Sequence, residues 1–178
     1  ADFKSQLYHY AKSIKENNTL IQSLDQTIFT EFLQRTTQPD FQRKLGQAID
    51  FILQSELLFF VGIGTSGIMA TYGANLFSSL YKFSLAVTDP QNSPVYYVSE
   101  QFDEHICLIV FSVSGQNEDV VDYINRFRLH HIKVISMTNS ANSTIARISD
   151  LNIPYYINVE TYQETNITSQ LPVVYLLE

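Results

Sequence analysis

Five short apolar runs alternate along the chain with longer segments in which apolar residues recur every three or four positions. The runs lie at about 57–61, 83–87, 106–111, 132–137 and 151–156. The third run lacks polar alternation, as expected for a strand that is buried on both faces. Because parallel neighbours need helical crossovers, strands that alternate with helices predict an α/β fold around a five-stranded parallel sheet.

The longer segments have the spacing of helices that bury one face. Helices are expected at 2–35 (with a break after residue 16), 41–55, 67–81, 117–129 and 144–149. A short helix at 95–100 and a last helix from about Asn166 onward complete the set. Asp40 follows a proline that breaks the pattern, and it is a candidate N-cap for the helix at 41–55.

These elements predict a three-layer sandwich whose strands follow the flavodoxin-like order 2-1-3-4-5, with additional helices at the N-terminus. Residues 1–37 are expected to form the helical linker or extension, and residues 38–178 the α/β domain. In the predicted order, strands 1 and 3 flank the switch point, where ligands bind beyond the carboxyl ends of the strands.

Composition narrows the class of protein. The chain of 178 residues has 11 Lys and Arg against 18 Asp and Glu, a net charge of −7, which argues against nucleic-acid binding by this chain itself. The apolar runs are far shorter than the roughly 18–20 residues that span a bilayer, and the polar N-terminus does not resemble a signal peptide. A single cysteine, Cys107, suits a reducing compartment. We therefore expect a cytoplasmic protein without membrane contact.

Two turns rich in glycine and hydroxyl groups carry the candidate chemistry. The turn at 62–67 (GIGTSG) follows the first strand, and the turn at 112–115 (SVSG) follows the third. Both run into helices, whose first N–H groups and dipoles favour anions. Since the predicted order places strands 1 and 3 side by side, both turns are expected to face one crevice. Neither turn contains Lys or Arg, so an anion would be held by neutral donors, with moderate affinity.

The same two turns, together with the segments 133–138 and 145–150, resemble the SIS (sugar isomerase) domain over about residues 45–156. The family's second motif reads roughly Ser-x-Ser-Gly-x-Thr-x-Glu/Asp. The resemblance implies that hydroxyls and amides of the two loops hold the phosphate of a phosphosugar. Carried over by position, the implied ligand-binding residues are Gly64, Thr65, Ser66, Ser112, Val113, Ser114, Gly115 and Asn117. Asn117 departs from the family pattern, in which threonine is usual.

Within this family the chain is most similar to the sugar-phosphate sensor domain of RpiR-type bacterial transcription regulators. Those proteins join an N-terminal helix-turn-helix domain to a SIS domain through a helix like 2–35, and 168–178 resembles the start of their last helix, which we expect to be truncated here. The resemblance implies a non-catalytic effector domain, spanning 38–178, for a phosphorylated sugar or amino sugar, with DNA bound only through a missing N-terminal domain. The N-terminal helices and the cut last helix would be exposed alone, so we expect a homodimer or homotetramer.

An aldose–ketose isomerase is the first alternative, and it would need a general base beside the sugar. The segment 67–81 contains no acid and no histidine, which leaves Glu164 as the best candidate. An NAD(P)-binding Rossmann domain is the second alternative, because 62–67 matches G-x-G-x-x-G and Asp89 lies where a ribose-binding acid would stand. A nicotinamide site has no need of the loop at 112–115. We expect no catalytic residue, no cofactor and no metal site.

Overall fold

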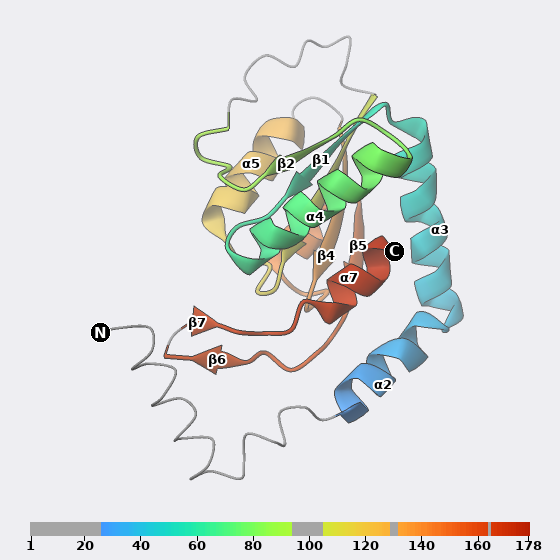
Figure 1. Cartoon of the computed structure of the whole chain (residues 1–178), viewed down its shortest axis with the longest axis vertical. Coiled ribbons are helices and arrows are strands. Elements are labelled where there is room, and N and C mark those ends of the chain that lie inside the picture. The colour runs from blue at the N-terminus through green and yellow to red at the C-terminus, as the bar shows by residue number, and fades with distance from the viewer. Residues whose placement is uncertain (1–25, 94–104, 129–131, 164) are drawn as a thin grey trace.

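The computed structural model describes residues 26–93, 105–128, 132–163 and 165–178. Its centre is a sheet of five parallel strands (Figure 1). The strands are β1 (Leu57–Val61), β2 (Ser84–Val87), β3 (Ile106–Ser112), β4 (Lys133–Thr138) and β5 (Leu151–Pro154). Their spatial order is β2-β1-β3-β4-β5, which confirms the predicted flavodoxin-like topology.

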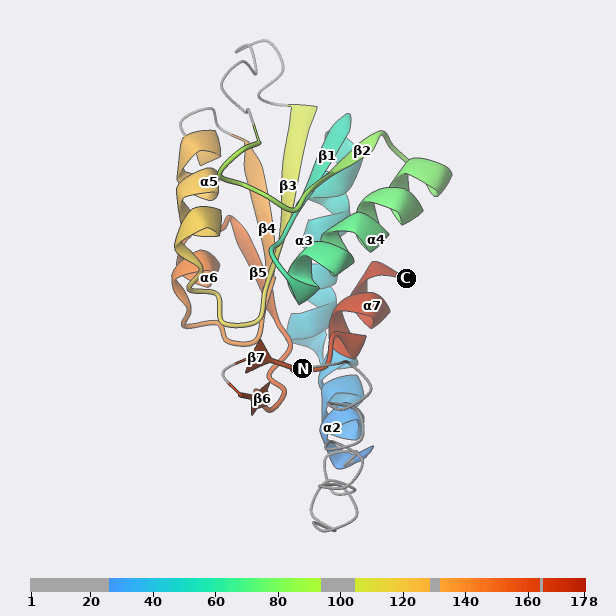
Figure 2. The same cartoon turned by 60° about the vertical axis from the view of Figure 1, so that its left-hand side comes forward.

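Helices cover both faces of this sheet and complete the predicted three layers. One face carries α2 (Gln26–Thr36), α3 (Pro39–Gln54), α4 (Thr65–Leu80) and α7 (Leu171–Leu177). The opposite face carries α5 (Glu118–Arg128) and α6 (Thr144–Ile148). Figure 2 shows α5 and α6 on one side of the sheet and α3, α4 and α7 on the other.

The central strand β3 explains how the two cores divide. All seven of its residues are buried. Cys107, Ile109 and Phe111 pack into the core on the α3 and α4 side, whereas Leu108 and Val110 pack into the core beneath α5. A strand with two buried faces has no polar alternation, which is why its sequence pattern was so clear.

Helix α2 is attached to the rest of the fold at two places. The Phe32 ring makes edge contacts with the Phe41 ring of α3 and with the Tyr175 ring of α7. The Arg35 guanidinium donates hydrogen bonds to the main-chain oxygens of Tyr155 and Tyr156, just after β5. The part of the predicted N-terminal helix that precedes residue 26 lies outside the described residues, as does the predicted helix at 95–100.

Two expectations about helix starts are wrong. The last helix does not begin near Asn166; a short antiparallel hairpin, β6 (Thr161–Tyr162) and β7 (Thr165–Asn166), precedes it, and α7 starts only at Leu171. Pro172 lies in its first turn, where the fixed φ of proline suits a helix start. Asp40 is not an N-cap either, because α3 starts at Pro39, and the Asp40 carboxylate instead pairs with Arg43 and Lys44 within the helix.

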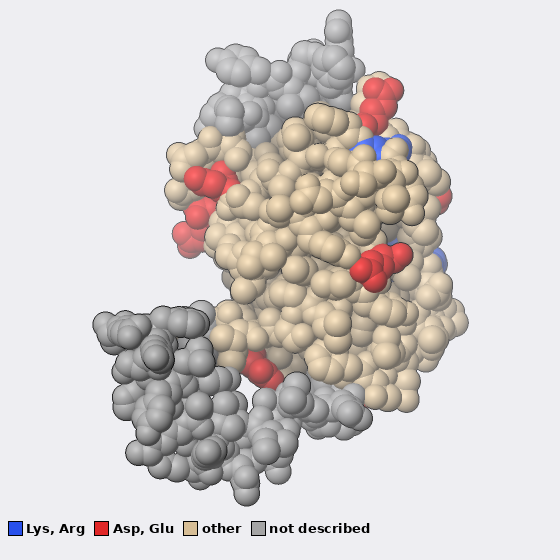
Figure 3. All heavy atoms as spheres, in the orientation of Figure 1, with Lys and Arg blue, Asp and Glu red and all other residues tan. Residues whose placement is uncertain are grey.

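The predicted fifth strand is also shorter than expected. It ends at Pro154, and Tyr156 adopts a positive φ of 47°, a conformation that breaks the extended chain. None of the described helices is long and apolar enough to cross a bilayer. On the face drawn in Figure 3, the described surface shows scattered acidic side chains and no cluster of Lys and Arg.

Candidate phosphate-binding pocket

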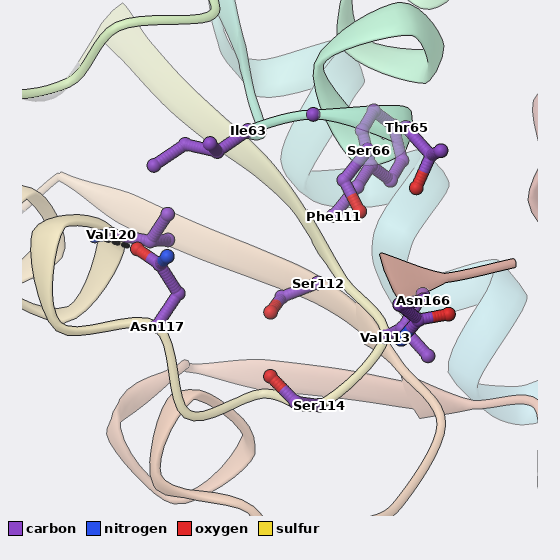
Figure 4. A pocket seen from close by; sticks show the side chains of 11 residues that line it. Ile63, Thr65, Ser66, Phe111, Ser112, Val113, Ser114, Asn117, Val120 and Asn166 are labelled. Carbon is purple, nitrogen blue, oxygen red and sulfur yellow. Dashed lines mark hydrogen bonds between the residues drawn. The ribbon is translucent and has the colours of Figure 1, made fainter. Parts of the chain in front are cut away.

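A pocket of about 370 Å³ lies at the carboxyl ends of β1 and β3, where the strand order reverses. Figure 4 shows the side chains of both predicted turns around it. Seven of the eight predicted ligand-binding residues line it: Gly64, Thr65, Ser66, Ser112, Val113, Ser114 and Asn117. The structure therefore brings the two turns together as expected, while their contact with a ligand stays a prediction.

The first turn is shaped by two glycines. A Cβ atom on Gly62 would lie 2.4 Å from the main-chain oxygen of Ser66, so only glycine lets the turn pack this closely on the start of α4. Gly64 caps α4 with a φ of 61°, in the region that favours glycine. Thr65 and Ser66 then form the first turn of the helix, where N–H groups lack intrahelical acceptors. The glycine spacing thus serves the turn itself.

The second turn uses its hydroxyl oxygens to hold its own backbone. Ser112 Oγ accepts a hydrogen bond from the Gly115 N–H at 3.1 Å, and Ser114 Oγ accepts one from the Gln116 N–H at 3.2 Å. A hydroxyl that accepts in this way keeps its own hydrogen for donation. Both serines therefore have an O–H available to an anion in the pocket.

Asn117 is the N-cap of α5. Its Oδ1 accepts the Val120 N–H at 3.1 Å, a bond that Figure 4 marks with a dashed line. Because the oxygen is engaged, the amide nitrogen is the part of the side chain that has hydrogens to offer. The departure from threonine thus preserves the cap and adds an N–H₂ donor at the pocket.

Gly115 is the one predicted residue that does not line the pocket. Its N–H is bonded to Ser112, its φ is 62°, and an added Cβ would lie 2.2 Å from Ser143 Oγ. These three facts give it a role in shaping the loop. A contact between its backbone and a ligand remains untested.

The electrostatics of the pocket rest on dipoles. Within the described part of the chain, none of the lining side chains is charged. The N-terminus of α5 faces the same loop and favours negative charge, although Glu118 and Asp119 in its first turn oppose it. The Asp119 carboxylate accepts a hydrogen bond from Gln91 Nε2 at 2.6 Å.

Asp89, which supported the NAD(P) alternative, does not line the pocket. The Asp89 carboxylate accepts hydrogen bonds from the main-chain and side-chain nitrogens of Asn92, and so closes the turn after β2 as a cap. Glu164, the candidate base of the isomerase alternative, falls outside the described residues. Among the residues that the structure describes, no group of three or more His, Cys, Asp or Glu could hold a metal ion.

Cys107 is fully buried in β3. Burial, with a smaller contribution from the charge of Asp150, raises the pKa of its thiol to about 12. The thiol is therefore uncharged at neutral pH and is not a nucleophile.

Asn166 lines the pocket and was missed as a site residue. It is the second residue of β7 and was expected to begin the last helix. Its Oδ1 accepts the Thr168 N–H at 2.9 Å, an Asx turn that competes with helix formation. The spacing of an asparagine two residues before a threonine was the only sequence signal for this turn.

A family model described as SIS domain matches residues 51–177. Two curated relatives also match. An uncharacterized HTH-type transcriptional regulator of Clostridium perfringens, CPE0189, is 27% identical over 130 residues, which cover 72% of this chain and 46% of the relative. A second such regulator, YbbH of Bacillus subtilis, is 24% identical over 114 residues, covering 64% of this chain and 39% of the relative. The chain thus spans less than half the length of these relatives.

Several solved structures share the fold. MJ1247 of Methanococcus jannaschii, inferred to be a 3-hexulose-6-phosphate isomerase, has a TM-score of 0.71 and 20% identity, covering 88% of this chain and 85% of its own. The sugar isomerase domain of an RpiR transcription factor from Sphaerobacter thermophilus has a TM-score of 0.63 and 18% identity, with 88% and 86% covered. Vibrio vulnificus NanR, complexed with ManNAc-6P, has a TM-score of 0.69 and 18% identity, with 94% and 64% covered.

Proposed function

Because the chain belongs to the SIS domain family, we propose that it is the phosphosugar-binding effector domain of a bacterial transcription regulator of sugar metabolism. The ligand is a phosphorylated sugar or amino sugar, bound in the pocket between β1 and β3. DNA is bound by a separate helix-turn-helix domain, and binding of the sugar phosphate alters the affinity of that domain for its operator. The protein acts in the cytoplasm as a homodimer or homotetramer.

One observation carries this proposal: two loops rich in hydroxyls and the N-terminus of α5 converge on one pocket, and none of its described lining residues is charged. Each of Ser112, Ser114 and Asn117 uses an oxygen to hold the backbone and keeps hydrogen-bond donors for the ligand. Converging donors at a helix N-terminus are suited to a phosphate group.

The regulatory role is supported by the relatives. Both curated relatives are HTH-type transcriptional regulators, each more than twice as long as the stretch it shares with this chain. The NanR structure holds ManNAc-6P, so a protein with this fold binds a phosphorylated amino sugar. A net charge of −7 fits a chain that leaves DNA contact to another domain.

An isomerase is the alternative function, favoured by the likeness to MJ1247. Isomerisation needs a general base close to the sugar carbons. Among the described residues, no acid or histidine lines the pocket, which favours binding without catalysis. Conversion of a bound sugar phosphate that Glu164→Gln abolishes would establish the alternative.

A thermal-shift screen tests the proposal. The chain is heated with sugar phosphates, amino-sugar phosphates, the parent sugars, or NAD(P). A ligand at a hundred times its Kd raises the free energy of unfolding by about 2.7 kcal/mol, so binding at that level is easily seen. We expect stabilisation by a sugar phosphate and none by its parent sugar. Stabilisation by NAD(H) alone would contradict the proposal.

The double variant Ser112→Ala/Ser114→Ala locates the site. It removes both hydroxyl donors, and we expect at least about a fivefold loss of sugar-phosphate affinity, since each hydrogen bond contributes about 0.5–1.5 kcal/mol. Ser79→Ala is the matched control, because Ser79 is exposed at the far end of α4 and its hydroxyl donates only to Asn75 within the helix. Unchanged affinity in the double variant would mean that the phosphate binds elsewhere.

A further inference from the structure

We infer that Asn166 recognises the sugar part of the ligand by donating hydrogen bonds from its side-chain amide, and so helps to set which sugar phosphate is bound. This inference rests on the proposed function and adds a specificity-determining residue to it. Asn166 lies in β7, an element separate from the loops after β1 and β3 that hold the phosphate donors.

The orientation of the Asn166 amide follows from its partner. The Thr168 N–H can be satisfied only by an oxygen, so the atom 2.9 Å from it is Oδ1 and not Nδ2. In Figure 4 this oxygen is directed away from Ser112 and Ser114. Within the described part of the chain, no acceptor is bonded to Nδ2, which leaves two N–H donors on a side chain that lines the pocket.

The position of Asn166 is held by hydrogen bonds at the base of the hairpin. The Thr168 hydroxyl accepts a hydrogen bond from the main-chain N–H of Glu160 at 2.9 Å, and the Ile167 N–H donates to the main-chain oxygen of Glu160 at 2.8 Å. Thr168 is buried, so these bonds are protected from water. A donor whose support is fixed before binding loses less entropy when a ligand arrives.

The size of the pocket points to the sugar as the partner of Asn166. About 370 Å³ falls within the range of roughly 300–1,000 Å³ that is typical of pockets for whole small molecules. A phosphate has only five heavy atoms, so it would fill a small part of this volume. Asn166 lines the pocket together with the side chains of Ile63 and Val113, which are apolar and cannot hydrogen-bond to a sugar. Neutral sugar oxygens are suitable acceptors for a neutral amide.

Two variants distinguish the Nδ2 donor of Asn166 from its role in the turn to Thr168. Asn166→Ala removes the amide and the acceptor for Thr168. Asn166→Ser keeps an oxygen that accepts the N–H two residues ahead, but is too short to place a donor where Nδ2 lies. Asn158→Ala is the control, because Asn158 is exposed in the segment that precedes the hairpin.

Affinities are measured by calorimetry on the full chain with inorganic phosphate, with ManNAc-6P and with a panel of hexose 6-phosphates. For the sugar phosphate that binds the unmodified chain, we expect both Asn166 variants to lose roughly tenfold in affinity. We expect inorganic phosphate to bind within about twofold of the unmodified chain, and Asn158→Ala to bind both ligands normally.

Three results would overturn the inference. Equal losses for inorganic phosphate and sugar phosphate would mean that Asn166 holds the phosphate. Normal sugar-phosphate binding by Asn166→Ser, with a loss only in Asn166→Ala, would mean that Asn166 acts through the turn alone. Normal binding by both variants would exclude any role. Failure of the unmodified chain to bind any sugar phosphate would instead contradict the proposed function itself, and is thereby distinguished from these three.

Discussion

The substitution Asn117→Asp is expected to change stability and ligand affinity in opposite directions. Asn117 Oδ1 caps α5 by accepting the Val120 N–H, while the amide nitrogen remains for the ligand. Aspartate keeps an oxygen for the cap and replaces the N–H₂ group by a second, negatively charged oxygen. The same side chain then serves the helix and repels the phosphate.

The two magnitudes can be worked from the structure. A carboxylate at a helix N-terminus stabilises by about 0.3–1 kcal/mol, and Glu118 and Asp119 next to it reduce that gain. For a domain of this size, about 1 kcal/mol shifts Tm by about 2–4 °C, so Tm should stay constant or rise by a few degrees. Two unit charges 4 Å apart repel by about 1 kcal/mol in water and about 4 kcal/mol at an effective dielectric constant of 20. Affinity for a sugar phosphate should therefore fall tenfold or more.

Thermal denaturation without ligand and calorimetric titration with a sugar phosphate measure both effects. Asn125→Asp is the control, since Asn125 is exposed on the same helix and does not line the pocket. Asn117→Ala should lose about 1 kcal/mol of stability with the cap. The reasoning is refuted if Asn117→Asp binds the ligand within twofold of the unmodified chain, or if it is destabilised as much as Asn117→Ala.

Two further predictions concern the core. Gly73→Ala should destabilise the fold by about 1–3 kcal/mol, because the new Cβ would lie 2.7 Å from two ring carbons of Phe60. Gly46→Ala on α3 should stabilise the fold by about 0.5–1 kcal/mol, because nothing lies within 4 Å of the new Cβ and alanine is the better helix former. Urea denaturation midpoints compare the two, and equal shifts would contradict the packing argument. Cys107 should react with a thiol reagent at pH 9 only in denaturant, because burial keeps its thiol protonated up to about pH 12. The contribution of this thiol to the free energy of unfolding is fully present below the pKa of the thiol in the unfolded chain. It is lost as pH rises from that pKa toward about 12, and Cys107→Ala should lack this pH-dependent loss of stability.

The sheet and the meeting of the two loops were predictable because each rests on a local pattern. The apolar run at 106–111 identified the central strand β3, and the alternation of strands with helices gave the topology. Once β1 and β3 are neighbours, the turns that follow them must face the same crevice. Seven of the eight predicted residues reach the pocket for this reason alone.

The hairpin and the start of α3 were not predictable in the same way. Each strand of the β6–β7 hairpin has only two residues, too few for any periodicity to show. Asn166 and Thr168 stop the helical pattern by hydrogen bonding to main-chain groups, which a pattern of apolar spacing does not detect. Asp40 looked like a cap because it has the right side chain, but Pro39 already occupies the first helical position.

Hydrogen bonds from side chains to the main chain determine which side-chain donors at the pocket remain unbonded. The main-chain N–H of Asn139 donates to the main-chain oxygen of Val113 in the second loop. The side chain of Asn139 donates to the main-chain oxygen of Ile157 and accepts from its main-chain N–H. Both the oxygen and the nitrogen of the Asn139 amide are bonded to the main chain, so this side chain holds the second loop against the segment after β5. Asn117 and Asn166 engage only the oxygen and keep their donors. Which atoms of an asparagine side chain are bonded to the main chain therefore separates Asn139 from Asn117 and Asn166, and this difference cannot be read from the sequence.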